Sequence, residues 1–356
     1  MVTTSTGHAG AERVVRSLAL GLQDYEVEVA YLSGESTAFD LELEAMGIHV
    51  ARLAGRRSRP FGLARRLGEL LRARRPALVH SHLHHANVLA SKVLAADQTV
   101  ALIHTVHVIE RRYRPLRPWL ERRAAMRASR VACVSVSVAE HLRKSGWPAD
   151  KLVTVPNGID TAAYSSVPVL DLDGEPVIAG VGRLQAQKGF DLLLRAFARV
   201  AHSVPAARME IAGVGPDAQS LAALAEKLGI AERVDWLGFR SDVAGVFASA
   251  RVVAFPSRYE GFGLVLAEAG AAARPVVAFD LQTTREIVVP EETGRIVPAG
   301  DLDAFADSLA ALLQDPESAR RQGSAARLRI QRKFDEQQMV AGYASLYASL
   351  PASPTG

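Results

Sequence analysis

Two glutamates flank a glycine-rich turn in the stretch SRYEGFGLVLAEAG, residues 257–270. Glu260 lies before Gly261-Phe262-Gly263, and Glu268 follows two turns inside the helix expected after that turn. The two carboxylates are therefore expected roughly 10 Å apart along the helix axis. This separation does not suit two groups that act on one bond. It suits carboxylates that bind different hydroxyl-bearing parts of one extended ligand, such as a sugar and a ribose joined by phosphates.

The glycine-rich turn itself predicts an anion site. Because Gly261, Phe262 and Gly263 lie at a helix N-terminus, their free N–H groups and the partial positive charge of the helix end suit a phosphate. The glycines also let a ligand approach the backbone without a side-chain clash. Taken alone, the segment has a simpler explanation, in which one glutamate lies near a helix cap and the other in an ordinary helix.

A basic pair precedes this segment in the chain. In AGVGRLQAQKG, Arg183 follows a strand-like run directly after Gly182, and Lys188 stands at a helix start. Arginine offers a planar fork of donors to phosphate oxygens, and lysine offers a compact point charge. Five residues apart across a turn, the two cations could bind both phosphates of a diphosphate, although an isolated basic pair in a loop is more often solvent-exposed.

Two further strand ends could approach the same ligand. IAGVGPD, which contains Val214 and Gly215, is a glycine turn that exposes backbone, although such a turn alone is common. WLGFRSD could present the backbone of Phe239 and Arg240 to a flat ring. These segments predict contacts to the same ligand only in combination with the glutamate segment and the basic pair.

The elements that must position these residues are short strands alternating with helices. Helical stretches such as 11–22, 61–74, 87–96 and 137–145 separate the strands of the first half. The strand-like runs are YEVEVAYL, IHVARL, ALVHSH, TVALIHTVH, RVACVSV and KLVTVPN, then PVIAGVG, ARMEIAGVG, RVDWLG, RVVAFPS, PVVAFD and GRIVPAG. This alternation predicts an α/β fold with parallel sheets covered on both faces.

A length of 356 residues favours two domains. The proline-, serine- and acid-containing segment 160–176 separates them, so we expect an N-terminal domain over 1–165 and a C-terminal domain over 166–335. Two doubly wound domains would face each other across a cleft, and ligands of such sheets bind at the carboxyl ends of the strands. The strand before the first helix is expected to be clipped or very short, through a truncated start or a missing edge feature.

Composition favours a soluble enzyme, with 49% hydrophobic and 22% charged residues. We find no apolar run of about 18 residues and no basic-then-apolar leader, and we therefore expect a cytoplasmic protein. The single cysteine, Cys133, lies in the strand-like run RVACVSVS and is not expected to act as a nucleophile.

Charge is distributed unevenly along the chain. Residues 1–165 carry 23 Lys and Arg against 15 Asp and Glu, whereas the remainder carries 19 against 23. A basic face on the first domain suits an anionic partner such as a phospholipid surface, and a solvated arginine-rich face explains it equally well. Nucleic acid is not expected as a partner, because neither basic run has interleaved aromatic residues or a recognised module.

Taken together, the motifs resemble one family. GRLQAQKG, IAGVGP, LGF and SRYEGFGLVLAEAGA are similar to segments of the retaining nucleotide-sugar glycosyltransferases of family 4, which have the GT-B fold of two Rossmann-like domains. Similar landmarks of the first half are GHAGAERVVRSLALGL, HSHLHHAN, HTVH, RVACVSVSVAEHL and VPNGID. By this resemblance, the final helix within 336–356 crosses back to the first domain.

The resemblance implies roles for the second-domain residues. Arg183 and Lys188 would neutralise the donor diphosphate as the leaving group develops charge. Glu268 would bind the ribose hydroxyls and Glu260 the transferred sugar. The backbone at Phe262, Gly263 and Leu264 would contact the sugar and phosphate.

The first domain would complete the donor site. The resemblance implies that the backbone of Gly10 approaches the diphosphate and that His107 contacts the 6-hydroxyl of the sugar. His104 is the second choice for that contact, and His82 would line the acceptor side. The sequence departs from the family at His8-Ala9, where a glycine usually precedes Gly10.

The histidines of HSHLHH invite a metal interpretation, because alternate residues of a strand share a face. No carboxylate or cysteine accompanies His80, His82, His84 and His85, so we do not expect a metal site. By the resemblance, neither a metal nor another cofactor is needed, since the nucleotide sugar is a co-substrate.

The sequence thus predicts a retaining, metal-independent transferase that moves a sugar from a UDP- or GDP-sugar to a hydroxyl acceptor. Glycans of the cell envelope, polysaccharides and glycolipids are the expected products, with peripheral association at the inner face of the cytoplasmic membrane. A nucleotide-sugar epimerase or hydrolase on the same fold is the alternative enzyme. A non-catalytic scaffold that binds nucleotide sugars is the alternative without catalysis.

Overall fold

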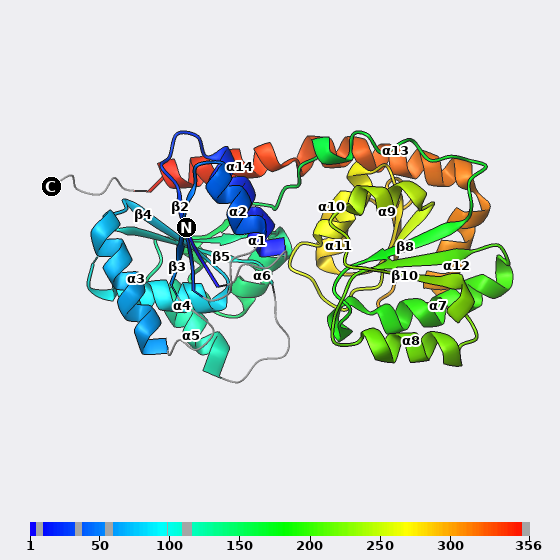
Figure 1. Cartoon of the computed structure of the whole chain (residues 1–356), viewed down its shortest axis with the longest axis horizontal. Helices are drawn as coiled ribbons and strands as arrows, with labels where there is room; N and C mark the ends of the chain where they lie inside the picture. Colours follow the sequence, from blue (N-terminus) through cyan, green and yellow to red (C-terminus); the bar gives the residue numbers. More distant parts are fainter. Residues whose placement is uncertain (5–9, 33–37, 54–59, 98, 109–115, 351–356) are drawn as a thin grey trace. The chain divides into compact units, whose positions relative to one another are not determined.

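Each half of the chain forms its own parallel sheet, as the alternation of strands and helices predicts (Figure 1). The computed structural model describes residues 1–4, 10–32, 38–53, 60–97, 99–108 and 116–350. The chain divides into unit 1, Met1–Asn157 with Glu336–Gly356, and unit 2, Gly158–Asp335. The predicted class, two doubly wound α/β domains, is confirmed.

Unit 1 contains a seven-stranded sheet in the order β3-β2-β1-β4-β5-β6-β7, with every strand pair parallel. Its strands are β1 Val2–Thr3, β2 Glu28–Tyr31, β3 His49–Arg52, β4 Leu78–His82, β5 Ala101–Val106, β6 Arg130–Cys133 and β7 Leu152–Thr154. Its helices are α1 Gly10–Gly21, α2 Ala38–Ala45, α3 Pro60–Arg74, α4 His84–Val93, α5 Leu116–Ala125, α6 Val136–Lys144 and α14 Glu336–Ala348.

The first strand is as short as the sequence predicts, but it lies inside the sheet and not at its edge. β1 has two residues and pairs with both β2 and β4 at the centre of the sheet. Val2 aligns with Ala30 on one side and with Ser81 on the other. The order of the sheet reverses at β1, so the position at which such sheets bind ligands lies beside the start of α1.

Unit 2 contains a six-stranded parallel sheet in the order β10-β9-β8-β11-β12-β13. Its strands are β8 Val177–Val181, β9 Arg208–Ala212, β10 Val234–Gly238, β11 Val252–Phe255, β12 Val276–Phe279 and β13 Gly294–Val297. Its helices are α7 Phe190–Ser203, α8 Ala218–Lys227, α9 Val243–Ser249, α10 Leu264–Ala271, α11 Gln282–Ile287, α12 Leu302–Gln314 and α13 Pro316–Lys333.

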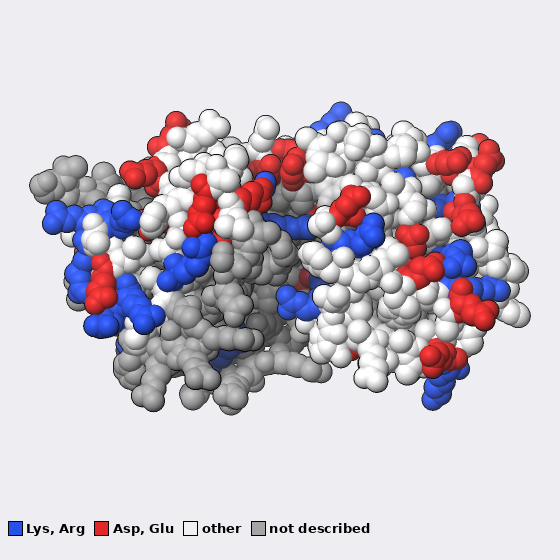
Figure 2. Space-filling view, viewed as in Figure 1, with Lys and Arg blue, Asp and Glu red and all other residues white. Residues whose placement is uncertain are grey.

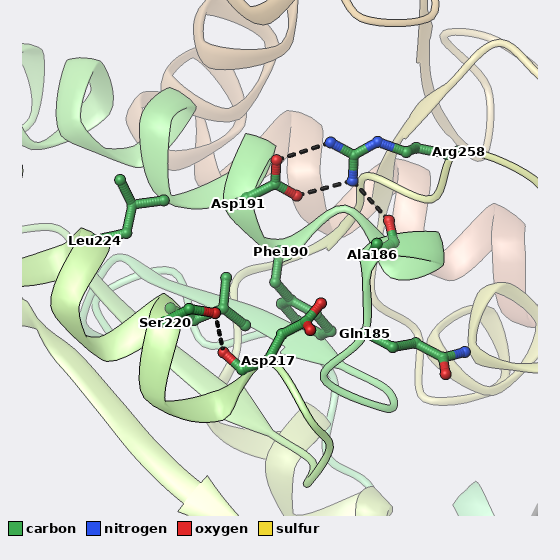
Figure 3. A pocket seen from close by; sticks show the side chains of 9 residues that line it. Gln185, Ala186, Phe190, Asp191, Asp217, Ser220, Leu224 and Arg258 are labelled. Carbon is green, nitrogen blue, oxygen red and sulfur yellow. Dashed lines mark hydrogen bonds and ion pairs between the residues drawn. The ribbon is translucent and has the colours of Figure 1, made fainter.

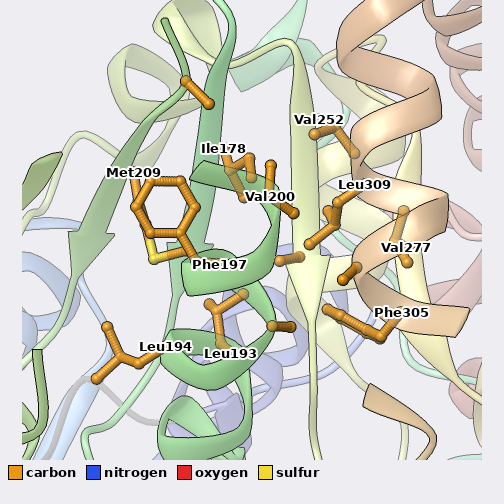
Figure 4. Close-up of a cluster of buried hydrophobic side chains, with 14 of the residues drawn as sticks. Ile178, Leu193, Leu194, Phe197, Val200, Met209, Val252, Val277, Phe305 and Leu309 are labelled. Atoms are coloured by element: carbon orange, nitrogen blue, oxygen red, sulfur yellow. The ribbon is translucent and has the colours of Figure 1, made fainter. Parts of the chain in front are cut away.

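The core of unit 2 explains why its central strands are apolar throughout. All four residues of β11 and all four of β12 are buried, because helices cover both faces of the sheet. On one face, Phe197 of α7 and Phe305 of α12 pack against Ile178 and Val252 of the central strands (Figure 4). Burying an aromatic side chain of this size contributes about 2–3 kcal/mol, so this layer fixes the strand ends that carry the candidate site.

The C-terminal helix α14 belongs to the core of unit 1. Tyr343 and Leu346 pack in one apolar cluster with Leu18 of α1 and Ile103 of β5. The Ser17 hydroxyl also donates to Glu336 Oε2 over 2.6 Å. The last helix is therefore part of the layer that covers the first sheet.

No helix in the described part of the chain combines the length and apolar character needed to cross a membrane.

Candidate active site

Most of the predicted donor-side residues follow strands of the unit 2 sheet at one edge. β8 lies between β9 and β11, and the strand order reverses there, as at β1 in unit 1. Parallel strands place their carboxyl ends together, so the loops after β8, β9, β10 and β11 meet at this reversal. These loops carry Arg183 and Lys188, then Val214 and Gly215, then Phe239, and finally Glu260.

The structure brings Lys188 and Glu260 into direct contact. Lys188 Nζ lies 2.6 Å from Glu260 Oε1, and the two side chains are only 20% and 6% exposed. The Ser257 hydroxyl donates to the same oxygen over 2.8 Å, and the ammonium also lies 5.9 Å from the centre of the Phe255 ring. An ammonium has three donors, so one bond to Glu260 leaves donors for a ligand. The pair is thus a fixed cation beside a fixed carboxylate.

Gly189 allows the two loops to cross at van der Waals distance. It has a φ of +69°, and a Cβ there would lie 2.1 Å from the carbonyl oxygen of Pro256. Pro256 directly follows β11 and leads into Ser257. Glycine is therefore required where the loop of Lys188 passes the loop of Glu260.

Arg258 and Asp191, neither of which was predicted as a site residue, hold the same loops together. Arg258 forms a two-pronged ion pair with Asp191, at 2.8 and 2.7 Å, and donates to the Ala186 carbonyl over 2.6 Å (Figure 3). These hydrogen bonds lower the pKa of the Asp191 carboxyl below its usual value. Sequence spacing gives no signal for this contact, because the two residues lie 67 positions apart.

Helix α10 starts at Leu264, which corrects the expected place of Glu268. Glu268 is the fifth residue of the helix, slightly more than one turn inside it and not two. It is 2% exposed, so its side chain is buried. Gly263 precedes the helix with a φ of +89°, and the Phe262 ring, 3% exposed, packs edge-on against Phe334. The turn between Glu260 and the helix is therefore anchored by an aromatic contact.

Three other predicted donor-side residues, Arg183, Val214 and Phe239, are open to solvent. The Arg183 side chain is exposed and forms no ion pair within the described residues. Val214 is 54% exposed and Phe239 is 57% exposed, unusual values for apolar side chains at adjacent strand ends. Gly182, with a φ of +151°, faces the methylene groups of Lys188. The side chains of Arg183, Val214 and Phe239 are therefore exposed, in contrast to those of Lys188 and Glu260.

A pocket of about 320 Å³ lies beside the Lys188 loop, next to α7 and α8. The pocket is lined by that loop, the start of α7, α8 with its N-cap residue, and the loop after β11. The lining residues are Gln185, Ala186, Phe190, Asp191, Asp217, Ser220, Leu221, Leu224 and Arg258 (Figure 3). Neither Lys188 nor Glu260 contributes to it, so the pocket is separate from the ion pair.

In unit 1 the structure pairs two of the predicted histidines. His82 ends β4 and His107 follows β5, the next strand of the sheet. His82 Nδ1 lies 3.0 Å from His107 Nε2. Burial lowers the pKa of His107 to about 3 and lowers the pKa of His82 well below its usual value, so both rings are neutral at pH 7.

His104 lies inside β5, and its ring is fully engaged there. Its Nδ1 and Nε2 are hydrogen-bonded to the hydroxyls of Ser81 and Ser91, at 2.7 and 2.9 Å, and burial lowers its pKa to about 4. The ring is 1% exposed, a placement that leaves it packed within the unit.

The remaining histidines of HSHLHH have other partners. His80 is bonded to Tyr347 and Thr105, and His84 lies 3.2 Å from Glu121. Among the described residues, no group of three or more His, Cys, Asp or Glu side chains is placed to hold a metal ion. Cys133 is buried in β6, where burial raises its thiol pKa to about 12.

Gly10 is the first residue of α1, at the strand reversal of the first sheet. It therefore stands at a helix N-terminus, as Gly263 does in unit 2. The neighbouring departure from the family pattern, His8-Ala9, lies outside the described residues.

Two family models match the chain, one over each half. The model for glycosyltransferase family 4 matches residues 8–163, and the model for glycosyl transferases group 1 matches residues 167–329. The first match contains His82 and His107, and the second contains Lys188 and Glu260.

Named relatives share roughly a third of their residues with this chain over the aligned parts. Alpha-D-kanosaminyltransferase of Streptomyces kanamyceticus is 29% identical over 60% of this chain and 58% of its own length. Glycogen synthase of Mycobacterium tuberculosis is 28% identical over 78% of this chain and 69% of its own length. A GDP-mannose-dependent phosphatidylinositol monomannoside mannosyltransferase of Mycolicibacterium smegmatis is 32% identical over 58% of each chain.

Solved structures share the fold over nearly the whole chain. Anabaena Alr3699/HepE, in complex with UDP and glucose, superposes with a TM-score of 0.87 over 98% of this chain and 99% of its own, at 22% identity. Sucrose-phosphate synthase of Thermosynechococcus elongatus gives a TM-score of 0.80 over 98% of both chains, at 23% identity.

Proposed function

We propose that this chain, which belongs to the family 4 glycosyltransferases with the GT-B fold, transfers a sugar from a nucleotide diphosphate sugar to a hydroxyl group of an acceptor. The observation that carries the proposal is the contact between Lys188 and Glu260 at the strand reversal of unit 2. A nearly buried cation and carboxylate, both held by crossing loops, can bind a phosphate and a sugar hydroxyl side by side.

The chemistry requires stabilisation of negative charge. As the bond between the anomeric carbon and the phosphate oxygen breaks, its electron pair moves to the nucleoside diphosphate. Lys188, Arg183 and the N–H groups at the start of α10 would stabilise that charge, because donors fixed in place need no reorganisation during the reaction. Glu260 would hold the sugar, and Glu268 the ribose.

We further propose a retaining and metal-independent route. The departing phosphate oxygen takes the proton of the acceptor hydroxyl while the acceptor oxygen bonds to the anomeric carbon on the same face. Arg183 and Lys188 supply the positive charge that a divalent metal provides in other transferases. Both UDP and GDP are candidates for the nucleotide part of the donor, since HepE was solved with UDP and a mannosyltransferase relative depends on GDP-mannose.

Roles for the other predicted residues follow from their places at the strand ends. Exposed Val214 and Phe239, with the half-buried Gly215, suit the base side of the donor. Gly10 and His107 of unit 1 would contact the diphosphate and the sugar, and His82 would support the acceptor side. Glycolipids, polysaccharides and other envelope glycans are the expected classes of product.

A thermal-shift screen should identify the donor. A ligand that binds only the folded protein at 100 times its Kd stabilises it by about 2.7 kcal/mol, which corresponds to a rise of several degrees in Tm. We expect one of the UDP-, GDP- and ADP-sugars to raise Tm by this amount and the free nucleoside monophosphates to raise it less. Failure of all three donor classes to shift Tm would contradict the proposal.

Product analysis with and without acceptor distinguishes transfer from its alternatives. A transferase forms a glycoside only when acceptor is present, whereas an epimerase alters the sugar and a hydrolase frees it without acceptor. A binding scaffold would show the thermal shift and no product with a panel of lipid-linked, sugar and small-molecule acceptors.

The basic face of unit 1 supports a second proposal, reversible docking on anionic lipid. Lys and Arg side chains gather on this unit (Figure 2), and Arg65 and Arg72 of α3 are exposed. Each basic side chain near an anionic membrane contributes about 1 kcal/mol, so replacing both residues with glutamate should weaken binding to phosphatidylserine vesicles at least thirtyfold.

Vesicle sedimentation measures this effect. Arg320→Glu with Arg321→Glu on α13 of unit 2 is the matched control, since it makes the same charge change on exposed residues and should leave binding nearly unchanged. Equal binding of the wild-type protein to neutral and anionic vesicles would rule out the docking proposal.

A further inference from the structure

The contact between His82 and His107 consists of two imidazoles that share one proton. His82 Nδ1 and His107 Nε2 are 3.0 Å apart, and the ring centres are 5.3 Å apart. Each ring is neutral near pH 7, so each carries one N–H and one lone pair. One nitrogen of the contact must therefore donate and the other accept, and this choice fixes the tautomer of both rings.

The second nitrogen of His82 indicates which arrangement holds. The His82 side chain is fully buried, and its Nε2 has no hydrogen-bond partner within the described residues. If His107 donated, His82 would carry its proton on this isolated Nε2, and a buried N–H would lack an acceptor. If His82 Nδ1 donates, only a lone pair is left isolated. Isolated buried N–H groups are the rarer of the two, so the second arrangement is favoured.

The ring of His82 is also held in position from its other side. His80 stacks on it with ring centres 4.0 Å apart. His80 itself is fixed by hydrogen bonds from both ring nitrogens, to Tyr347 of α14 over 2.5 Å and to Thr105 of β5 over 2.6 Å. His82 therefore cannot rotate away from His107 without disturbing a buried network that reaches the C-terminal helix.

We infer that His82 is a positioning residue that holds His107 in the Nδ1–H tautomer, so that His107 offers a hydrogen-bond donor to an oxygen of the substrate. The inference rests on the proposed function for the identity of that oxygen, a sugar hydroxyl. The tautomer itself depends only on the contacts of unit 1. The Nδ1–H group would donate a hydrogen bond to an oxygen lone pair. Every nucleotide sugar with a free hydroxyl at this position can supply such a lone pair.

Two variants of His82 test the inference through geometry. Asparagine places its amide near the position of the imidazole Nδ1 and can still donate to His107, whereas glutamine reaches the position of Nε2 and cannot. We expect His82→Gln to lower kcat for sugar transfer about tenfold, the effect of one lost hydrogen bond, and His82→Asn to remain within about threefold of wild type. The Kd for UDP and GDP should be unchanged in both. Equal losses in the two variants would show that His82 acts only through packing.

A second measurement does not require activity. Long-range proton–nitrogen NMR correlations of protein labelled with ¹⁵N-histidine distinguish the two neutral tautomers, and His107→Gln assigns the signal. We expect the Nδ1–H pattern for His107 in the wild-type protein and in His82→Asn. An Nε2–H pattern in the wild-type protein would overturn the inference even if sugar transfer is demonstrated. If no donor is turned over, the NMR result alone decides the tautomer, so the failure of the proposed function stays distinguishable.

Discussion

Lys188→Ala and Glu260→Ala are each expected to lower the rate of sugar transfer by at least 10²-fold. Removing one fixed donor that stabilises the charge of a transition state usually has an effect of 10²–10³. In the proposed reaction Lys188 would be such a donor, because Glu260 and the Phe255 ring hold its ammonium in place before any ligand arrives. Removing Glu260 would take away the proposed sugar contact and also the anchor of the Lys188 ammonium.

The measurement is the initial rate with the donor found by the thermal-shift screen. Lys227→Ala, on the exposed end of α8, is the matched control and should leave the rate within about twofold of wild type. Lys188→Ala leaves a nearly buried carboxylate without its cation, so Tm is compared in parallel to show that the variants are folded. A rate near that of wild type in either folded variant would count heavily against the assignment.

The two losses should not add in the double variant. When two residues act as a unit in catalysis, removing either one already removes most of their joint effect on the rate. The variant that lacks both Lys188 and Glu260 is therefore expected to be about as slow as the slower single variant. Additive losses would instead mean that the two side chains act at separate steps.

Gly189→Ala is expected to destabilise the protein by about 3 kcal/mol or more and to abolish binding of nucleoside diphosphate. The added Cβ would meet the Pro256 carbonyl oxygen at 2.1 Å, and the φ of +69° is unfavourable for alanine. The conformational effect is about 1–2 kcal/mol, and forcing an atom into packed structure adds about 1–3 kcal/mol. Relief of the clash requires the loops of Lys188 and Glu260 to separate.

Gly229→Ala is an unusually well matched control. Gly229 has a φ of +70°, and an added Cβ would find no atom within 4 Å. The difference between the two variants in urea denaturation therefore measures the clash alone. Equal midpoints, or retained binding of UDP or GDP by Gly189→Ala, would show that the loops do not cross as described.

The sequence was sufficient for the fold class and for the loops that carry the candidate site. Buried runs such as VVAF, followed by helices, imply parallel strands, and parallel strands imply one shared edge for Lys188 and Glu260. The reversal of strand order at β8 follows the usual arrangement of such sheets. These inferences depend on periodicity, which a single sequence contains.

Contacts between loops could not be predicted in this way. Lys188 and Glu260 are 72 positions apart, and spacing alone assigned them to different parts of a ligand without showing that they touch. For the same reason, spacing in the sequence did not predict the ion pair of Arg258 with Asp191 or the contact of His82 with His107. The start of α10 was also misplaced relative to Glu268, because the glycines that precede Leu264 adopt a turn and not a first helical turn.

The two-pronged contact of Arg258 has a consequence for binding energetics. Arg258 joins the segment after β11 to both the backbone at Ala186 and the first turn of α7, so the loop is ordered by the protein alone. A loop that is already immobile loses little conformational entropy when a ligand arrives. The free energy of the proposed phosphate contacts would then appear as affinity. Loosening Arg258 should therefore weaken association without removing any atom proposed to contact the ligand.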